Sequence, residues 1–311
     1  MTRPNPTFSV NVDVTNPGQF FACCGLLELA HRLWPGAVGW FEPESPRFAV
    51  ASETGGGGLD ELFQALCGCG LSGLSDEDSA ERKALELEQA KLKKQGRRLP
   101  PEKEARRKEL GAQARQGVIR VGGPFTLLLN WWQTDDDAVA SPKTWAGKQE
   151  LRQVARAAQD ALSGITDLES MFDHACVLRK PQKPCKKGRS QSGKVEPFYF
   201  DARRFVHALD TGFSLDTQGV ETVAHPAVEL LCLVGLQRFR PATSERWAFE
   251  YWSWSQPLSP PVAAAVVCGL APSPGQRGYS FTLQFRDDQK RYKAFDFATL
   301  TRGGEPWQRT P

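Results

Sequence analysis

The chain has few of the residues that usually build metal and catalytic centres. Only 4 of its 311 residues are histidines, and His31, His174, His207 and His225 lie far apart. A nuclease centre needs clustered carboxylates with a lysine, or a histidine-rich set of metal ligands. Asp135–Asp137 has no histidine nearby and is more typical of an acidic turn than of a metal site. We therefore expect no catalytic residue, no metal and no cofactor.

Long apolar segments are absent as well. Met1–Thr7 does not contain the apolar run of a secretion signal, and no stretch approaches the roughly 20 apolar residues that cross a bilayer. The sequence therefore predicts a cytoplasmic protein without a membrane partner. Its 8 cysteines include no C-x-x-C pair, which disfavours zinc, and a cytoplasmic location disfavours disulfides. We expect free thiols that are buried as small apolar side chains.

A large excess of charge is also missing, because the formal net charge is only +3. The distribution of the charge is more informative than its sum. Between residues 179 and 194 there are 7 basic residues and no acidic one, with prolines, glycines and serines among them. A loop of this composition cannot bury a core and is suited to bind a polyanion. Its candidate nucleic-acid-binding residues are Arg179, Lys180, Lys183, Lys186, Lys187, Arg189 and Lys194.

What the sequence does contain is a strong pattern of strand, turn and helix near its beginning. Apolar and polar residues alternate over Phe8–Val14, which predicts a half-buried strand. Thr15–Gly18 has the proline and glycine of a turn. Gln19–Trp34 is apolar around most of a helical circumference, and Pro35-Gly36 ends it. We expect this helix to be the core element on which the rest of the chain packs.

The remaining patterns predict an α+β protein, with a mixed β-sheet, packed core helices and an inserted charged helical hairpin. We expect Phe198–Phe200 to be a short strand. We expect residues 1–74 to form the N-terminal part of the α+β body and residues 118–311 to form its remainder, with the basic loop at 179–194. Residues 75–117 are rich in Glu, Lys, Arg, Gln and Ala, and we expect them to form the hairpin. An exposed, salt-bridged hairpin and a docking arm for a protein or nucleic acid both fit this composition.

A second basic feature lies on a predicted helix at Trp145–Leu162. Lys148, Arg152 and Arg156 are spaced by four residues, so they share one face and form a basic ridge. The opposite face is apolar. We add these three residues to the candidate nucleic-acid-binding set.

The turn before the core helix offers two further candidates, Asn16 and Gln19. A turn held between a core strand and a core helix is rigid, and the side-chain amides of Asn and Gln can read base edges. The alternative is purely structural: Asn16 caps the helix and Gln19 is its first residue.

Two other patterns allow both a functional and a structural interpretation. Gln19 precedes Cys23 and Cys24, loosely like a papain-type thiol site, with His207 or His225 as the base. The spacing differs by one or two residues, so core cysteines explain the pattern better than a thiol-dependent hydrolase. The tryptophans of the predicted strand Trp247–Trp254 could stack on bases, but their alternation with other aromatic residues favours a core or a subunit interface.

Two blocks of sequence carry a resemblance to a known family. The first is FSVNVDVTNPGQFFACCGLLELA at residues 8–30. The second consists of PFYFD at 197–201, DTGFS at 210–214 and the segment from Pro226 to Pro241. In this order they resemble a CRISPR-associated protein family of type I-U systems, also called type I-G.

The resemblance implies a non-catalytic, large-subunit-type component of Cascade, the crRNA-guided surveillance complex of antiviral defence. Its expected partners are crRNA and target DNA, including the motif that flanks the target, and the other Cascade subunits, which form the backbone and hold the crRNA ends. Cleavage would belong to a separate helicase-nuclease that the complex recruits. The resemblance assigns no role to any single residue.

Overall fold

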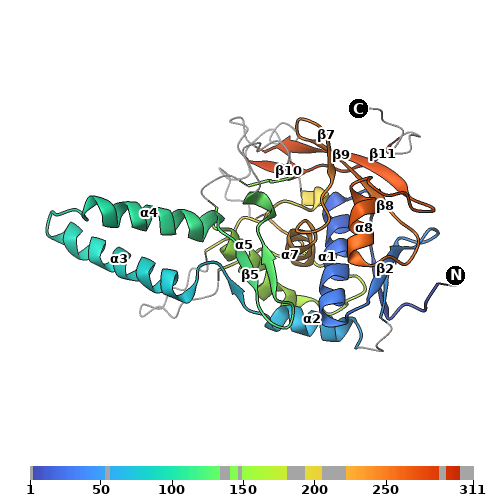
Figure 1. Ribbon diagram of the computed structural model, residues 1–311, viewed down its shortest axis with the longest axis horizontal. Coiled ribbons are helices and arrows are strands. Elements are labelled where there is room, and N and C mark those ends of the chain that lie inside the picture. Colours follow the sequence, from blue (N-terminus) through green and yellow to red (C-terminus); the bar gives the residue numbers. More distant parts are fainter. Residues whose placement is uncertain are drawn as a thin grey trace.

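The computed structural model describes residues 3–52, 57–133, 141–145, 149–180, 193–204, 222–286 and 292–301. It combines helices with antiparallel sheets, which confirms the predicted α+β class (Figure 1). The helices are α1 (Pro17–Leu33), α2 (Leu59–Gly68), α3 (Asp76–Lys94), α4 (Pro101–Gln116), α5 (Leu151–Ala161), α7 (Pro226–Gly235) and α8 (Pro260–Val267). The strands are β1 (Phe8–Asn11), β2 (Val38–Phe41), β3 (Arg47–Ala51), β4 (Leu71–Ser72), β5 (Ile119–Val121), β6 (Leu127–Leu129), β7 (Ala242–Glu245), β8 (Ala248–Ser253), β9 (Arg277–Phe285), β10 (Lys293–Phe295) and β11 (Thr299–Leu300).

Helix α1 lies at the centre of the body, as the sequence predicted. Asn16 caps its start, and Pro17 takes the first helical position, where a missing N–H breaks no hydrogen bond. Every residue from Pro17 to Ala30 is buried. The helix begins at Pro17 rather than Gln19, because the Asn16 side chain already organises the first turn by accepting a hydrogen bond from the Gly18 N–H.

Helices α1 and α7 are the main pair of the core, and two glycines set how closely they approach. A Cβ atom at Gly25 would lie 2.1 Å from the carbonyl oxygen of Leu231. A Cβ atom at Gly235 would lie 2.0 Å from the carbonyl oxygen of Phe21. Only glycine permits backbones to approach this closely. The two helices therefore pack backbone to backbone at the middle of the body.

Three sheets are arranged around this helix pair. Their strand orders are β1-β3-β2, β10-β9-β8-β7 with β11 paired to β9, and β4-β5-β6. The strand pairs in the described part of the chain are antiparallel, so three antiparallel sheets stand where the sequence predicted one mixed sheet. Phe20 of α1 links the first two sheets, because its ring stacks on Phe41 and also packs against Tyr251.

The aromatic strand β8 belongs to this core. Tyr251 and Trp254 are completely buried, and Trp252 is nearly so. The Nε1 of Trp254 donates to the carbonyl oxygen of Gly39, and the Tyr251 hydroxyl donates to that of Val14. Burial confirms the core interpretation for these three residues, whose rings are not accessible for base stacking. Trp247 is half-buried, with the Lys293 ammonium over its ring.

Helices α3 and α4 form a hairpin that projects from the body (Figure 1). Residues 75–117 are called the arm below. Few apolar residues hold the two helices together, among them Leu85, Leu99 and Leu110, which are buried. Ion pairs cross between the helices, from Lys103 to Glu88 and from Arg106 to Glu81. The arm is thus a salt-bridged helical hairpin.

Two predicted elements differ from the structure for a local reason. Phe198–Phe200 is not a strand, because the N–H groups of Phe198 and Phe200 bind the carboxyl group of Glu229 instead of a neighbouring strand. The predicted helix at Trp145–Leu162 begins only at Leu151, as α5. Trp145 instead packs its ring among other aromatic rings, those of Trp131 and Phe198 included.

Candidate functional site

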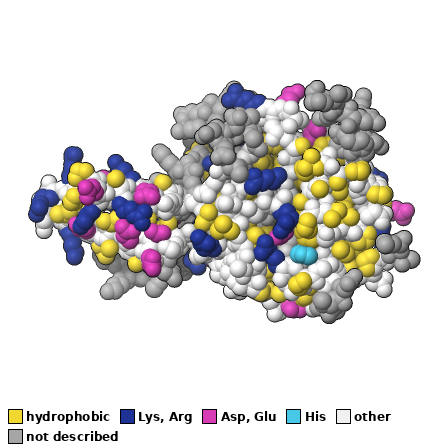
Figure 2. Space-filling view, viewed as in Figure 1, with side chains coloured by type: hydrophobic (Ala, Val, Ile, Leu, Met, Phe, Trp, Pro, Cys, Tyr) yellow, Lys and Arg dark blue, Asp and Glu magenta, His cyan; other side chains and the backbone are white. Residues whose placement is uncertain are grey.

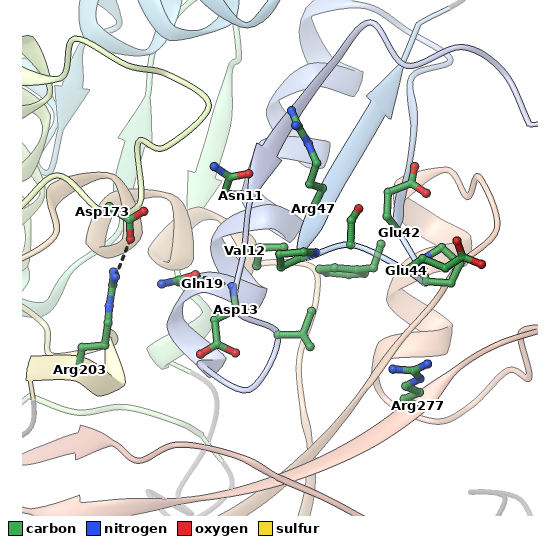
Figure 3. Close-up of a pocket in the computed structure, with 15 residues that line it drawn as sticks. Asn11, Val12, Asp13, Gln19, Glu42, Glu44, Arg47, Asp173, Arg203 and Arg277 are labelled. Atoms are coloured by element: carbon green, nitrogen blue, oxygen red, sulfur yellow. Dashed lines mark hydrogen bonds and ion pairs between the residues drawn. The ribbon is translucent and has the colours of Figure 1, made fainter.

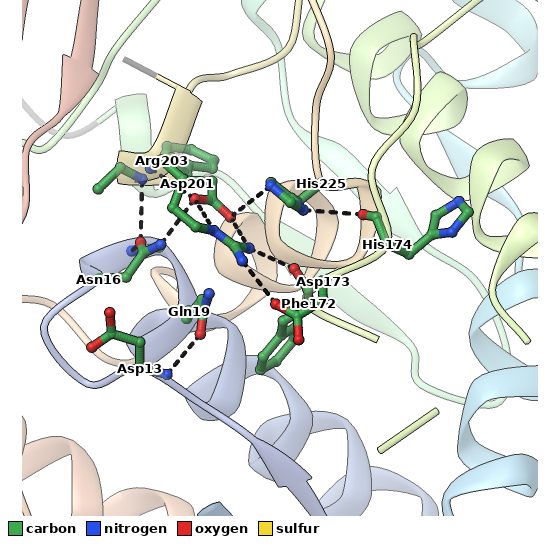
Figure 4. A network of polar contacts seen from close by, with 12 residues as sticks. Asp13, Asn16, Gln19, Phe172, Asp173, His174, Asp201, Arg203 and His225 are labelled. Atoms are coloured by element: carbon green, nitrogen blue, oxygen red, sulfur yellow. Dashed lines mark hydrogen bonds and ion pairs between the residues drawn. The ribbon is translucent and has the colours of Figure 1, made fainter. Parts of the chain in front are cut away.

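A buried polar network surrounds the start of α1 and joins segments that are far apart in the sequence (Figure 4). The amide of Asn16 is held within it through both its nitrogen and its oxygen. Its Nδ2 donates to Asp201 Oδ1 at 2.9 Å, and its Oδ1 accepts from the N–H groups of Gly18 and Ala202. Asn16 and Asp201 are both completely buried. The predicted role of Asn16 in reading bases is therefore corrected: the structural alternative, a helix cap, describes it.

Arg203 closes the network on the outer side. Its guanidinium donates to both carboxylate oxygens of Asp201, to Asp173 Oδ1 at 2.8 Å and to the carbonyl oxygen of Phe172. Burial by itself would raise the pKa of Asp201, but the hydrogen bonds from Arg203 and the nearby charge of His225 outweigh it and lower that pKa. The Asp201 carboxylate is thus held ionised inside the fold, and it orders the Arg203 side chain.

Glu229 behaves in the opposite way. Its side chain is completely buried on α7 and accepts hydrogen bonds from the N–H groups of Phe198 and Phe200. Burial, followed by repulsion from Asp201, raises the pKa of Glu229 to about 8. Of two neighbouring buried carboxyl groups, one is therefore held ionised and the other is protonated near neutral pH.

A cavity of about 530 Å³ opens beside this network (Figure 3). Its walls come from the end of β1, the turn between β2 and β3, the start of α1 and the start of β9. Charged groups of both signs surround it, and they include Asp13, Glu42, Glu44, Arg47, Asp173, Arg203 and Arg277. Such a lining suits a polar ligand that offers both donors and acceptors.

Gln19 is the predicted site residue that reaches this cavity. It is only 4% exposed, and its Oε1 accepts a hydrogen bond from the Asp13 N–H at 2.7 Å. This bond fixes the amide, and its nitrogen points away from Asp13, toward the side on which the lining residues Asp173 and Arg203 lie (Figure 3). Gln19 is therefore a pre-oriented hydrogen-bond donor at the wall of the cavity.

The basic ridge lies on a different part of the body. Arg152 and Arg156 are on one face of α5, and Arg152 packs against the backbone at Gly73 while Arg156 is exposed. Lys148 lies outside the described residues. Arg152 and Arg156 do not line the cavity, so the structure does not bring the basic ridge and Gln19 into one site.

The described part of the basic loop is its stem. Arg179 and Lys194 pair across an antiparallel bridge, and the Lys180 N–H donates to the carbonyl oxygen of Gly193. Lys194 also forms an ion pair with Glu196 at 2.8 Å, which reduces its value as a phosphate ligand. Lys183, Lys186, Lys187 and Arg189 lie outside the described residues, as does Asp135–Asp137.

The thiol alternative finds no support in the surroundings of Cys23 and Cys24. Both side chains are completely buried within α1, and burial raises the pKa of both thiols well above its ordinary value. A nucleophilic cysteine needs the opposite conditions, an accessible sulfur and a lowered pKa. His225 is held by the carbonyl oxygen of His174 and lies 3.9 Å from Asp201, while His207 is outside the described residues.

The expectation of buried free thiols holds for part of the cysteines. Cys69 and Cys232 are buried like the pair on α1, Cys176 and Cys268 are half-buried, and Cys67 is exposed. No group of three or more His, Cys, Asp or Glu side chains in the described ranges is arranged to hold a metal ion. No helix among those ranges is long and apolar enough to cross a membrane.

Sequence reasoning missed the buried polar network of Asp201, Arg203 and Glu229. A usable signal was present, because Asp201 and Glu229 each follow strongly apolar residues, and a carboxylate in such a context must find buried partners.

Comparisons of the chain with protein-family models, with curated proteins and with solved structures find no match.

Proposed function

We propose that this protein is a non-catalytic, nucleic-acid-binding subunit of a type I-U crRNA-guided surveillance complex that acts in antiviral defence in the cytoplasm. The observation that carries the proposal is that the described parts of the two sequence blocks, which exclude DTGFS at 210–214, meet in space. Asn16 from the first block binds Asp201 from the second, and α1 packs on α7 through Gly25 and Gly235. The described parts of the two blocks therefore form one framework in the core of the body.

The cavity beside this framework supports a contact with the flanking motif of the target DNA. The Gln19 amide is fixed before any ligand binds, so little rotamer entropy is lost when it donates to a base edge. Arg277 on the same walls is suited to phosphate oxygens, whereas Arg47 is paired with Glu169 and Arg203 with Asp173 and Asp201. The rest of the protein needs no such rigid base contact, because pairing with the crRNA reads the target sequence itself.

The remaining expected partners follow from the same proposal. The other Cascade subunits form the backbone and hold the crRNA ends, and a recruited helicase-nuclease cleaves the DNA. The basic ridge and basic loop are the proposed contacts to crRNA or target DNA, through phosphates and without reading sequence.

Assembly is the direct test of the proposal. The chain should be co-expressed with the other type I-U subunits and a crRNA, and the mixture separated by size exclusion. We expect the chain to elute with the crRNA in one large complex, and a parallel expression without crRNA controls for association between proteins alone. Elution as a folded free chain, with the other subunits and crRNA assembled without it, would contradict the proposal.

A further inference from the structure

The outer end of the arm carries a cluster of positive charge that the ion pairs of the arm do not neutralise. Along its length, basic side chains are matched to acidic ones, as in the pairs Arg82–Glu86 and Arg107–Glu104. The matching stops toward the turn between the helices. Residues 89–101 contain no Asp or Glu, whereas five basic side chains lie between Lys91 and Arg98. These five, Lys91, Lys93, Lys94, Arg97 and Arg98, are called the cationic tip.

Every side chain of the cationic tip is exposed. None of the five forms an ion pair with a carboxylate in the described part of the chain. Part of the cluster has a local use, because Lys91, Lys93 and Lys94 lie in the last turn of α3, where cations complement the helix dipole. Arg97 and Arg98 lie beyond the helix end and gain nothing from that effect. The charge density therefore exceeds what the end of a helix requires.

The position of the cluster also separates it from the body. Helix α3 has 19 residues and is about 28 Å long at 1.5 Å per residue. Figure 2 shows basic side chains around the outer end of the arm, far from the surface of the body. The length of α3 is about three Debye lengths at physiological ionic strength, so charges on the body neither weaken nor strengthen the electrostatic potential at the tip. It can reach a polyanion that extends well past the body.

The composition of the tip favours a nucleic acid over an acidic protein. Protein interfaces are depleted in lysine and depend on buried apolar or aromatic anchors. The segment from Lys91 to Arg98 has no aromatic residue, and its one large apolar side chain, Leu92, is half-buried. Lysine and arginine without aromatic neighbours are typical of phosphate contacts, whereas single-strand binders add rings on which bases stack.

We propose that the cationic tip binds the phosphate backbone of a nucleic-acid duplex without reading its sequence. The identity of that duplex as target DNA rests on the function proposed above, whereas the phosphate chemistry of the tip does not. The arm would then hold the duplex at a point about one arm length from the body.

The test compares two variants with equal loss of charge in the intact chain. The tip variant carries Lys93→Gln, Arg97→Gln and Arg98→Gln. The control variant carries Lys83→Gln, Lys108→Gln and Arg120→Gln, which are exposed positions away from the tip. Affinity for a fluorescent DNA duplex of random sequence is measured by anisotropy at several salt concentrations. Circular dichroism checks that both variants keep the helix content of the parent chain.

We expect the tip variant to bind at least about tenfold more weakly at physiological salt, and its log-log salt slope to fall in magnitude by about 2 to 3, one unit for each lost phosphate contact. The control variant should stay close to the parent chain. Equal affinity and slope for the tip variant and the parent, or no duplex binding by the parent at low salt, would overturn the proposal. The proposal would also be overturned if the tip variant kept its duplex binding but lost a partner subunit, because the tip would then contact protein. None of these results decides assembly with crRNA, which is measured separately.

Discussion

At the scale of single residues, the two buried carboxyl groups at the start of α1 set how stability responds to pH. The folded state raises the pKa of Glu229 from an ordinary value of 4.5 to about 8, so it binds that proton more tightly than the unfolded chain does. Stability falls with rising pH wherever the folded state holds more protons. The stabilising contribution of Glu229 to the free energy of unfolding is therefore fully present below about pH 4.5 and is lost as the pH approaches 8. The lowered pKa of Asp201 acts in the opposite direction, but only at lower pH.

Glu229→Gln removes this titration, and it provides the first prediction. Between pH 5 and pH 8, the free energy of unfolding of the parent chain should fall relative to that of the variant, by up to about 1.4 kcal/mol per pH unit. Urea unfolding at several pH values measures the difference. The exposed substitution Glu77→Gln serves as the control and should run parallel to the parent. Parallel curves for Glu229→Gln as well would mean that Glu229 is ionised in the folded protein.

The residues around this site also mark the limit of sequence reasoning. Asn16 and Gln19 were identified as candidates from their place in the turn, but their roles depend on partners that are not local. Asn16 is occupied by Asp201, which lies 185 positions away. Gln19 is fixed by the neighbouring Asp13 and remains directed to the cavity. A sequence pattern can identify such polar side chains, but it cannot tell which of them are bound by distant residues in the folded protein.

At the scale of elements, the close packing of α1 on α7 depends on two glycines. Gly25→Ala should force the helices apart, since the new methyl group would lie 2.1 Å from a backbone oxygen that cannot rotate away. Overpacking of this kind costs about 1–3 kcal/mol of stability. The matched control is Gly68→Ala at the end of α2, where an added Cβ meets no atom within 4 Å. Thermal unfolding of both variants makes the comparison, and an equal melting temperature would show that the helix pair can adjust.

Element types were more predictable than their partners. The core helix, the aromatic strand and the charged hairpin follow from periodicity and composition, because burial and solvation act directly on those patterns. The prediction of a strand at Phe198–Phe200 was wrong, because the carboxyl group of Glu229 replaces a neighbouring strand as the hydrogen-bond partner. The three separate antiparallel sheets were not foreseen for the same reason, since strand pairing is decided by contacts distant in sequence.

At the scale of the whole molecule, the arm is joined to the body in a way that makes it separable. Strands β4 and β5 flank the arm and pair directly, with Leu71 opposite Val121. The two ends of the arm therefore leave the body close together, and a short bridge can replace it. The body keeps its own core around α1 and α7, to which the buried side chains of the arm, such as Leu85 and Leu99, do not belong.

We expect that replacing residues 75–117 with a short Gly/Ser bridge leaves a body that unfolds cooperatively. The urea m-value should be lower, because less surface is exposed on unfolding. The base of α4 contacts α5, so a modest loss of stability is expected there. Circular dichroism and urea unfolding provide the measurement, with the full-length chain as reference. A broad, non-cooperative transition would mean that the arm belongs to the folding unit of the body. A folded deletion would instead establish the arm as an appendage that the folding of the body does not require.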